Sequence, residues 1–406
     1  MQVTFKKSTG RGKIKVPPSK SMAHRLLLAA ALCDGECTVH GISECEDVAA
    51  TLDCMRAFGL RYLKEGDCVR VFGKGKDALC PLSPLPCRES GSTLRFLIPV
   101  ALLSGACVTF TGAPVLFTRP LSVYETLASE RGFLFRREKD SLTLRGPLTA
   151  GEFSVVGNIS SQFISGLLFA LPLLDGDSRI RITTAIESRS YIEMTLRTLA
   201  MFGIRVEWQD DHTLYVPGGQ VYRPGEVFVE GDYSSAAFPA ALNLFGSEVV
   251  LDGLSDDTVQ GDSAYLRYFP MLAAGVPTLY IGDCPDLGPI LFAVAAAKNG
   301  GIFDGTRRLK IKESDRAEAM ARELRKFGTS VSVYPDTVVI YPTDFHAPKE
   351  PLDGHNDHRI VMALSVLLTV TGGCIRGAEA VKKSYPTFFD DLKKLGVLWE
   401  AQTDEN

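Results

Sequence analysis

The chain has 406 residues, of which 45% are hydrophobic and 23% are charged, and its formal net charge is −4. A chain of this length usually divides into more than one domain, and this composition is typical of a globular protein. The negative net charge excludes the overall basic field with which many nucleic-acid-binding proteins attract their partners. We therefore expect no nucleic-acid partner, and any anion-binding site must be built from local groups.

The cysteine and histidine patterns give no sign of a metal site. Ten cysteines include no C-x-x-C pair, and no histidine cluster has the spacing of zinc ligands. We expect reduced, mostly buried thiols and no metal or cofactor. Residues 1–16 lack the apolar core of a signal peptide, and the longest apolar run, residues 360–370, is too short to cross a membrane. These patterns predict a cytoplasmic protein with no membrane contact, and we expect a monomer.

One sequence repeat recurs along the chain. It consists of an amphipathic helix that ends in an apolar–glycine pair, a strand, a polar turn and a second strand, with the alternation of a half-buried hairpin. Copies span residues 51–73, 126–146, 195–218, 266–282, 323–342 and, in shortened form, 391–400. Each terminal glycine suits the C′ position of a helix, where φ is positive. These glycines are Gly59, Gly132, Gly203, Gly275, Gly328 and Gly396.

A second, almost wholly apolar helix is expected in each repeat. The predicted helices span residues 19–32, 90–103, 160–174, 232–245, 286–297 and 356–370. A helix that is apolar on every side is buried. Six repeats make two groups of three, so we predict an α/β fold of two similar domains, each with central helices inside and sheets outside.

The apolar helices begin with polar first turns rich in Ser, Asp, Asn and Gly. Free backbone N–H groups and the helix dipole attract anions to such positions. The same residue types also serve simply as helix caps. Recurrence of the pattern in all six helices favours an anion-binding function.

The most informative stretch is Lys312-Glu313-Ser314-Asp315-Arg316, which opens an amphipathic run. Lys312 and Arg316 are four residues apart, and we expect them to share one face of that helix. Basic residues also open two apolar helices, at Lys20 to Arg25 and at His358-Arg359. Cations with a few carboxylates suit group transfer between phosphorylated or carboxylated substrates, with general acid–base help.

A series of motifs, in the same order, resembles those of the 5-enolpyruvylshikimate-3-phosphate synthase family. The motifs are PSKSMAHR, SGSTLR, TRP, SSQF, EGDYSSAA, PD, KESDR, NDHR and KKSYP, and they span nearly the whole chain. The resemblance implies transfer of the enolpyruvyl group of phosphoenolpyruvate to the 5-hydroxyl of shikimate 3-phosphate, with release of phosphate, in aromatic amino acid biosynthesis. It implies two inside-out α/β domains, residues 19–231 and residues 1–18 with 232–406, with the active site in the cleft between them and closure on ligand.

The resemblance also implies roles for individual residues. Shikimate 3-phosphate would be bound by Lys20, Ser21, Arg25, Ser160, Ser161, Gln162, Ser188, Tyr191, Asp286 and Lys312. Phosphoenolpyruvate would be bound by Lys20, Gly91, Arg119, Gln162, Arg316, Arg359 and Lys383. The catalytic residues would be Glu313, which protonates the methylene carbon, Asp286, the base toward the attacking hydroxyl, and Lys20. Gly91 implies inhibition by glyphosate in competition with phosphoenolpyruvate.

The chain departs from the family pattern at several positions. Arg189-Ser190 stands after Ser188 in place of the usual Lys-Pro, and Arg308 stands where an Asn often contacts substrate. Glu89-Ser90 replaces Asn-Ala before Gly91, and Phe96 replaces a frequent Pro. These changes put the fit around both substrates in question.

Two alternatives remain open from the sequence. The sister family that transfers the same group to UDP-N-acetylglucosamine has Lys-Asn where Lys20-Ser21 stands, and a cysteine near the position of Arg119. A non-enzymatic anion-binding module would need neither Glu313 nor Asp286, so the presence of both carboxylates favours an enzyme.

Overall fold

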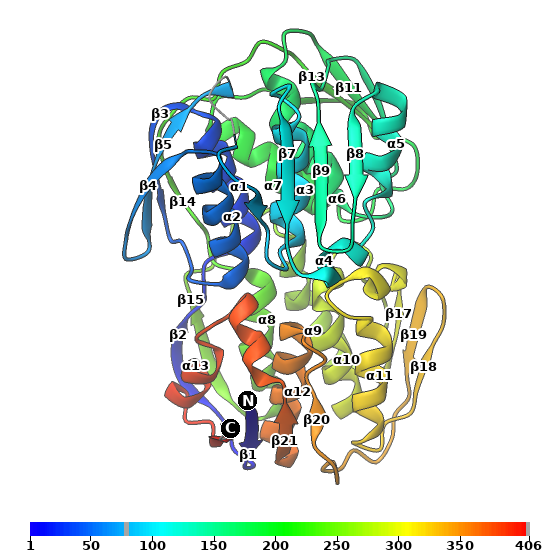
Figure 1. Ribbon diagram of the computed structural model, residues 1–406. Coiled ribbons are helices and arrows are strands. Elements are labelled where there is room, and N and C mark those ends of the chain that lie inside the picture. Colours follow the sequence, from blue (N-terminus) through cyan, green and yellow to red (C-terminus); the bar gives the residue numbers. More distant parts are fainter. Residues whose placement is uncertain (77–80, 403–406) are drawn as a thin grey trace. The chain divides into compact units, whose positions relative to one another are not determined.

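A computed structural model of the chain describes residues 1–76 and 81–402. The chain divides into two compact units, each with its own hydrophobic core (Figure 1). The N-terminal unit is Pro18–Glu230, and the C-terminal unit combines Met1–Pro17 with Gly231–Asn406. The first residues belong to the C-terminal unit because of their strand pairing. Strand β1 (Gln2–Phe5) pairs with β21 (Gly373–Arg376) and β22 (Trp399–Gln402), and β2 (Arg11–Lys15) pairs with β15 (Glu248–Asp252).

The N-terminal unit alternates helices with short strands. Its helices are α1 (Lys20–Leu32), α2 (Glu46–Ala57), α3 (Gly91–Ala101), α4 (Pro114–Thr118), α5 (Ser122–Arg131), α6 (Ser161–Ala170) and α7 (Arg189–Met201). Its strands are β3 (Asp34–His40), β4 (Arg61–Glu65), β5 (Cys68–Lys74), β6 (Leu85–Pro86), β7 (Cys107–Thr111), β8 (Leu134–Arg137), β9 (Ser141–Arg145), β10 (Glu152–Val155), β11 (Ser178–Ile182), β12 (Glu207–Asp210), β13 (Thr213–Val216) and β14 (Glu226–Phe228).

The C-terminal unit follows the same alternation. Its helices are α8 (Tyr233–Ala241), α9 (Tyr265–Ala274), α10 (Gly288–Ala297), α11 (Arg316–Arg325), α12 (His358–Thr371) and α13 (Phe388–Lys394). Its further strands are β15 (Glu248–Asp252), β16 (Thr278–Tyr280), β17 (Gly301–Asp304), β18 (Val331–Val333), β19 (Thr337–Ile340), β20 (Leu352–Asp353), β21 (Gly373–Arg376) and β22 (Trp399–Gln402). Short 3₁₀ turns include Pro285–Leu287, Arg307–Ile311 and Ala378–Lys383.

The predicted repeat is visible in the sheets. Sheets β14-β3-β5-β4, β6-β7-β9-β8, β10-β11-β13-β12, β16-β17-β19-β18 and β20-β21-β1-β22 share one topology. In each of these, the first two strands are parallel and the other two neighbouring pairs are antiparallel. Among the described residues, β2 and β15 form a parallel pair without a hairpin.

The apolar helices lie inside their units, as predicted. Helix α3 packs against both α1 and α6, and α8, α10 and α12 pack against one another. Nearly every side chain of α1, α10 and α12 is buried. Because these helices have no hydrophilic face, the remaining helices and the sheets must cover them, which gives the inside-out arrangement.

Two details of the predicted repeat are wrong, and both fall in the copy at 266–282. Gly275 has a φ of 178°, which is extended backbone, whereas the other five helix-ending glycines have positive φ. The segment after α9 forms no hairpin, because β16 instead pairs with β17 in the next sheet.

No helix in the described part of the chain is long and apolar enough to cross a membrane. The cysteines that the structure describes are free thiols, and most are buried, as expected.

Candidate active site

The start of α1 places Lys20 beside a carboxylate. Ser19 caps this helix by accepting a hydrogen bond from the Met22 N–H. The Lys20 Nζ donates to Asp47 Oδ2 at 2.8 Å, and this ion pair is largely buried. Asp47 lies in the first turn of α2. The Lys20 ammonium is therefore held at the helix start, in a fixed direction.

Arg25 is directed into the N-terminal unit. Its guanidinium donates to Thr195 Oγ1 at 2.8 Å, to the Ser21 carbonyl at 2.7 Å and to the Tyr191 carbonyl at 2.9 Å. It also lies 5.0 Å from the ring centroid of Phe96. Burial lowers the pKa of Arg25 to about 10, so the side chain remains charged at neutral pH. Arg25 thus joins the start of α1, at Ser21, to the start of α7, at Tyr191.

Gly91 and Arg119 are neighbours. A Cβ added at Gly91 would lie 2.9 Å from Arg119 Nη1, closer than van der Waals contact allows. The absence of a side chain at Gly91 therefore lets the guanidinium lie against the first turn of α3. Arg119 has extended backbone, as expected before a proline. Ser90 is the N-cap of α3, which gives this departure from the family pattern a local role.

Gln162 connects the starts of α6 and α3. Its Oε1 accepts from Arg95 Nη1 at 2.7 Å, and its Nε2 donates to Ser92 Oγ at 2.8 Å. These two bonds fix the orientation of the Gln162 amide. Ser160 caps α6 by accepting from the Gln162 N–H, and Ser161 is the buried first residue of that helix.

Ser188 precedes α7 and has the left-handed conformation, with φ 59° and ψ 45°. A non-glycine residue rarely adopts these angles unless its surroundings hold it there. Ser188 is buried, and Tyr191 follows in the first turn of α7.

In the C-terminal unit, Asp286 lies among cations. Its Oδ1 is 2.8 Å from Arg316 Nη1 and 3.2 Å from Lys312 Nζ, and its Oδ2 is 2.8 Å from Arg359 Nη2. Asp286 belongs to the 3₁₀ turn that precedes α10. The structure therefore brings together four of the predicted residues of this unit.

Arg316 extends this cluster to two more carboxylates. Its Nε is 2.8 Å from Asp357 Oδ2, and its Nη2 is 2.6 Å from Glu313 Oε2. Burial alone would lower the pKa of Arg316, but Asp357, Glu313 and Asp286 outweigh it and raise this pKa well above its usual value. We call the six side chains the carboxylate–cation cluster: Asp286, Glu313 and Asp357 with Lys312, Arg316 and Arg359. Its formal charges cancel, which makes burial of so many ions tolerable.

Lys312 is the cation of this cluster that can lose its charge near neutral pH. Burial lowers the pKa of Lys312 to about 8, and Arg308 and Arg316 act in the same direction, while Asp286 opposes them. Its ammonium is therefore mostly protonated at pH 7, but titrates just above it.

The prediction that Lys312 and Arg316 share a helix face is wrong. Helix α11 begins only at Arg316, because Asp315 acts as its N-cap and accepts from the Glu318 N–H at 3.2 Å. Lys312 has extended backbone before this cap. The two cations meet at Asp286 through tertiary contacts, not through helical spacing.

Lys383 and Arg308 donate to backbone carbonyls. Lys383 Nζ donates to the Asn356 carbonyl at 2.9 Å, and Asn356 has a positive φ of 52°. Arg308 Nη2 donates to the Gly282 carbonyl at 2.6 Å. Both contacts turn these cations toward loops of the C-terminal unit.

The residues of these networks that were not predicted include Asp47, Arg95, Ser234 and Asp357. Arg95, Ser234 and Asp357 lie inside the motifs SGSTLR, EGDYSSAA and NDHR, and this position was their only signal. Ser234, at the start of α8, accepts a hydrogen bond from Arg359 Nη1. Asp47 belongs to no motif, and only folding reveals its pairing with Lys20.

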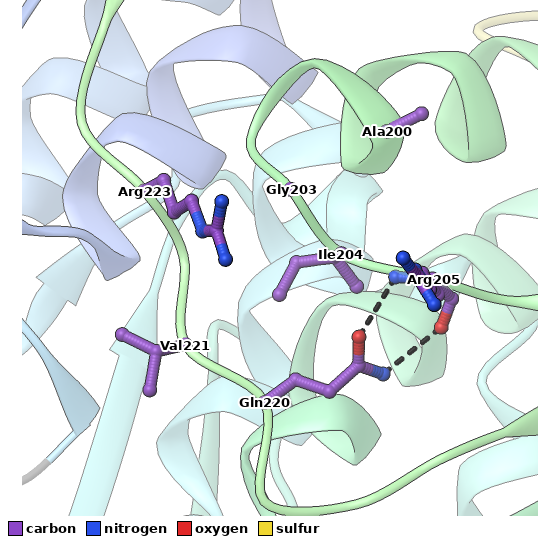
Figure 2. A pocket seen from close by; sticks show the side chains of 7 residues that line it. All are labelled: Ala200, Gly203, Ile204, Arg205, Gln220, Val221 and Arg223. Atoms are coloured by element: carbon purple, nitrogen blue, oxygen red, sulfur yellow. Dashed lines mark hydrogen bonds between the residues drawn. The ribbon is translucent and has the colours of Figure 1, made fainter.

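A separate hollow of about 570 Å³ lies on the N-terminal unit (Figure 2). It is lined by Ala200, Gly203, Ile204, Arg205, Gln220, Val221 and Arg223. The Gln220 amide is hydrogen-bonded to the backbone N–H and carbonyl of Arg205, as Figure 2 shows. None of the predicted substrate-binding residues lines this hollow.

A family model described as EPSP synthase (3-phosphoshikimate 1-carboxyvinyltransferase) matches residues 6–274 and 275–392. The chain belongs to the EPSP synthase family. Among its relatives, the 3-phosphoshikimate 1-carboxyvinyltransferase of Clostridium kluyveri is 38% identical, over 95% of both chains. The protein of the same name from Clostridium beijerinckii is 37% identical, over 96% of both chains.

Solved structures agree on the fold. EPSP synthase from Acinetobacter baumannii has a TM-score of 0.81 at 23% identity, covering 99% of this chain and 100% of the other. The enolpyruvyl transferase NikO from Streptomyces tendae has a TM-score of 0.80 at 14% identity, covering 100% and 99%. The predicted α/β fold class is thus confirmed. The family match confirms the predicted enzyme, a 3-phosphoshikimate 1-carboxyvinyltransferase of the shikimate pathway.

The carboxylate–cation cluster should contribute to the free energy of unfolding. Arg316→Met should destabilise the protein by about 3–5 kcal/mol, because it leaves buried carboxylates without their shared partner. Arg322→Met is the matched control, since Arg322 is exposed on the same helix and its loss should cost about 0.5 kcal/mol or less. Denaturant unfolding of both variants measures the difference, and equal midpoints would contradict the importance of the cluster.

Proposed function

We propose that each unit supplies one set of side chains for the transfer of the enolpyruvyl group from phosphoenolpyruvate to shikimate 3-phosphate. The N-terminal unit would supply residues from the starts of α1, α3, α6 and α7, together with Arg119. The C-terminal unit would supply Lys383 and the carboxylate–cation cluster. Assignments to both substrates draw on both units, so the substrates would have to be held by both at once.

The observation that carries this proposal is the convergence of Lys312, Arg316 and Arg359 on Asp286. Both substrates are polyanions, and they repel each other when brought side by side. Cations that are already positioned by carboxylates offset this repulsion without reorganisation during the reaction. A bound substrate anion would take over some of the contacts that the carboxylates make in the free protein.

In the N-terminal unit, we propose that Lys20, Ser21, Ser160, Ser161, Gln162, Ser188 and Tyr191 bind shikimate 3-phosphate. Arg25 would support this set, since its guanidinium already holds the carbonyls of Ser21 and Tyr191. Gly91 and Arg119 would bind phosphoenolpyruvate, with Lys20 and Gln162 shared between the two substrates.

The chemistry requires an acid and a base. We propose that Glu313 protonates the methylene carbon of phosphoenolpyruvate, which makes the adjacent carbon electrophilic. Asp286 would take the proton of the attacking 5-hydroxyl as the carbon–oxygen bond forms, and Lys20 would stabilise the developing charge. Loss of phosphate and of a proton from the methyl group of the tetrahedral intermediate then gives the enolpyruvyl product.

The direct test is phosphate release in the presence of shikimate 3-phosphate and phosphoenolpyruvate. Replacement of shikimate 3-phosphate by UDP-N-acetylglucosamine tests the sister activity in the same assay. If no phosphate were released with either acceptor, the proposed reaction would be contradicted.

We also propose that the enzyme acts in the cytoplasm as a monomer. The free thiols of the described cysteines fit a reducing compartment.

Glu313→Gln should lower turnover by about 10²–10⁴-fold while substrate affinity changes little. Glutamine keeps an oxygen that can accept the hydrogen bond from Arg316, but it cannot deliver the proton. The control is Glu318→Gln, because Glu318 is exposed in the first turn of α11. Near-normal turnover in Glu313→Gln would remove Glu313 from the role of acid.

The pKa of Lys312 predicts that kcat/KM for shikimate 3-phosphate depends on pH. A lysine with a pKa of about 8 loses its charge as the pH rises through 8. The kcat/KM for shikimate 3-phosphate should therefore fall about ten-fold between pH 7 and pH 9, since the protonated fraction falls from roughly nine-tenths to roughly one-tenth. Lys312→Arg should remove this fall because a guanidinium stays charged. The same profile in both proteins would show that another group titrates.

Gly91→Ala should weaken inhibition by glyphosate far more than it lowers turnover at saturating phosphoenolpyruvate. The new methyl group would displace the Arg119 guanidinium and shorten the space that the longer inhibitor needs. We expect wild-type inhibition to be competitive with phosphoenolpyruvate. Gly225→Ala is the control, because a Cβ there meets no atom within 4 Å. An unchanged inhibition constant in Gly91→Ala would show that Gly91 does not line this space.

A further inference from the structure

A chain of buried polar side chains joins α1, α2 and α3. His24 Nδ1 lies 2.7 Å from Thr51 Oγ1, and Thr51 Oγ1 lies 2.7 Å from Thr93 Oγ1. Thr93 Oγ1 then donates to Ser90 Oγ at 2.8 Å. These four side chains are between 0% and 3% exposed. The proposed binding contacts include none of the four.

The hydrogen bonds of this chain can run in only one direction. Each hydroxyl has a single proton to donate. Thr93 directs its proton toward Ser90 at 2.8 Å, with the Asp47 carbonyl as a more distant acceptor at 3.5 Å. In either case Thr51 must donate to Thr93, and His24 must donate to Thr51 through Nδ1–H. The reverse order would also place one proton in each contact, but it would require Ser90 to donate to Thr93, whereas Ser90 Oγ is the acceptor of the Thr93 hydroxyl.

This direction fixes the state of the imidazole. His24 carries its proton on Nδ1 and none on Nε2. Its Nε2 is buried and has no hydrogen-bond partner among the described residues. At such a position an unpaired N–H group costs more free energy than an unpaired nitrogen lone pair. Burial also lowers the pKa of His24 to about 3, with Lys20 and Arg25 acting in the same direction and Asp47 opposing them, so the ring stays neutral.

The other end of the chain is the cap of α3. Ser90 Oγ accepts both the Thr93 hydroxyl and the Thr93 N–H, and Gly91 is the next residue. The Cβ position of Gly91 lies within 2.9 Å of the Arg119 guanidinium, so a small shift of this first turn would move Arg119.

We infer that His24 is a positioning residue for phosphoenolpyruvate binding: through Thr51 and Thr93 it holds the Ser90 cap, and with it Gly91, in place beside Arg119. The inference rests on the proposed roles of Gly91 and Arg119. His24 touches neither substrate in this scheme and acts only as the donor that begins the chain.

The kinetic test compares Thr51→Val with Thr51→Ser. Valine has the shape of threonine but breaks both hydrogen bonds, whereas serine keeps the hydroxyl. Thr51→Val should raise the KM for phosphoenolpyruvate about five-fold, with kcat and the KM for shikimate 3-phosphate within about two-fold of wild type. Thr51→Ser should restore wild-type values.

The matched control is Thr109→Val, which removes a threonine–threonine hydrogen bond of 3.2 Å between β7 and β9 of the same unit. It should leave both KM values unchanged. An equal rise of both KM values in Thr51→Val, or a Thr51→Ser variant as impaired as Thr51→Val, would overturn the inference.

A second measurement needs no turnover. The ¹⁵N spectrum of wild-type protein should show one histidine with a protonated Nδ1 and an unprotonated Nε2 from pH 6 to pH 8, identified as the signal that Thr51→Ser shifts. A proton on Nε2, or titration in this range, would overturn the inference. Absence of phosphate release by the wild type would instead count against the proposed function, and the spectrum would still decide the direction of the chain.

Discussion

Compensation of buried charge is the constraint on which the carboxylate–cation cluster of the proposed site depends. Arg316 is 1% exposed in its side chain and contacts Asp286, Glu313 and Asp357. A guanidinium in this position would be too costly without its carboxylates, and the carboxylates would be too costly without the guanidinium. The cluster is therefore stable only as a whole. Its members come from the turn before α10, the segment before α11 with the first residue of that helix, and the start of α12, so the same charges also fix how these elements meet.

The placement of these charges follows from the shape of the central helices. Each has an apolar body that must lie inside its unit, and a polar first turn that cannot. Capping side chains such as Ser19, Ser90, Ser160 and Asp357 satisfy the free N–H groups at these starts. The side chains that we propose to bind substrate then stand next to the caps. The repeat thus produces a series of similar polar positions, which the sequence fills with different residues.

Some side chains would support the proposed site without contacting substrate. Asp47 orients Lys20 from another helix, and Arg95 orients the amide of Gln162. Arg25 is itself mostly occupied by contacts inside the protein. Such supporting contacts keep the polar groups in fixed directions before any ligand arrives, which is the condition for electrostatic stabilisation of a charged transition state.

The sequence by itself determined the apolar helices, their polar starts, most of the helix-ending glycines and, through the motifs, the family. These features depend on local periodicity, capping and backbone conformation, which neighbouring residues decide. It could not show that α11 begins at Arg316 rather than near Lys312, because both Asp315 as a cap and a longer helix suit the local pattern. It also could not show that Gly275 is extended, that Asp47 pairs with Lys20, or that His24 is joined to Ser90. Only the tertiary structure decided the last two points, because they depend on atoms from segments distant in sequence that meet when the apolar helices pack.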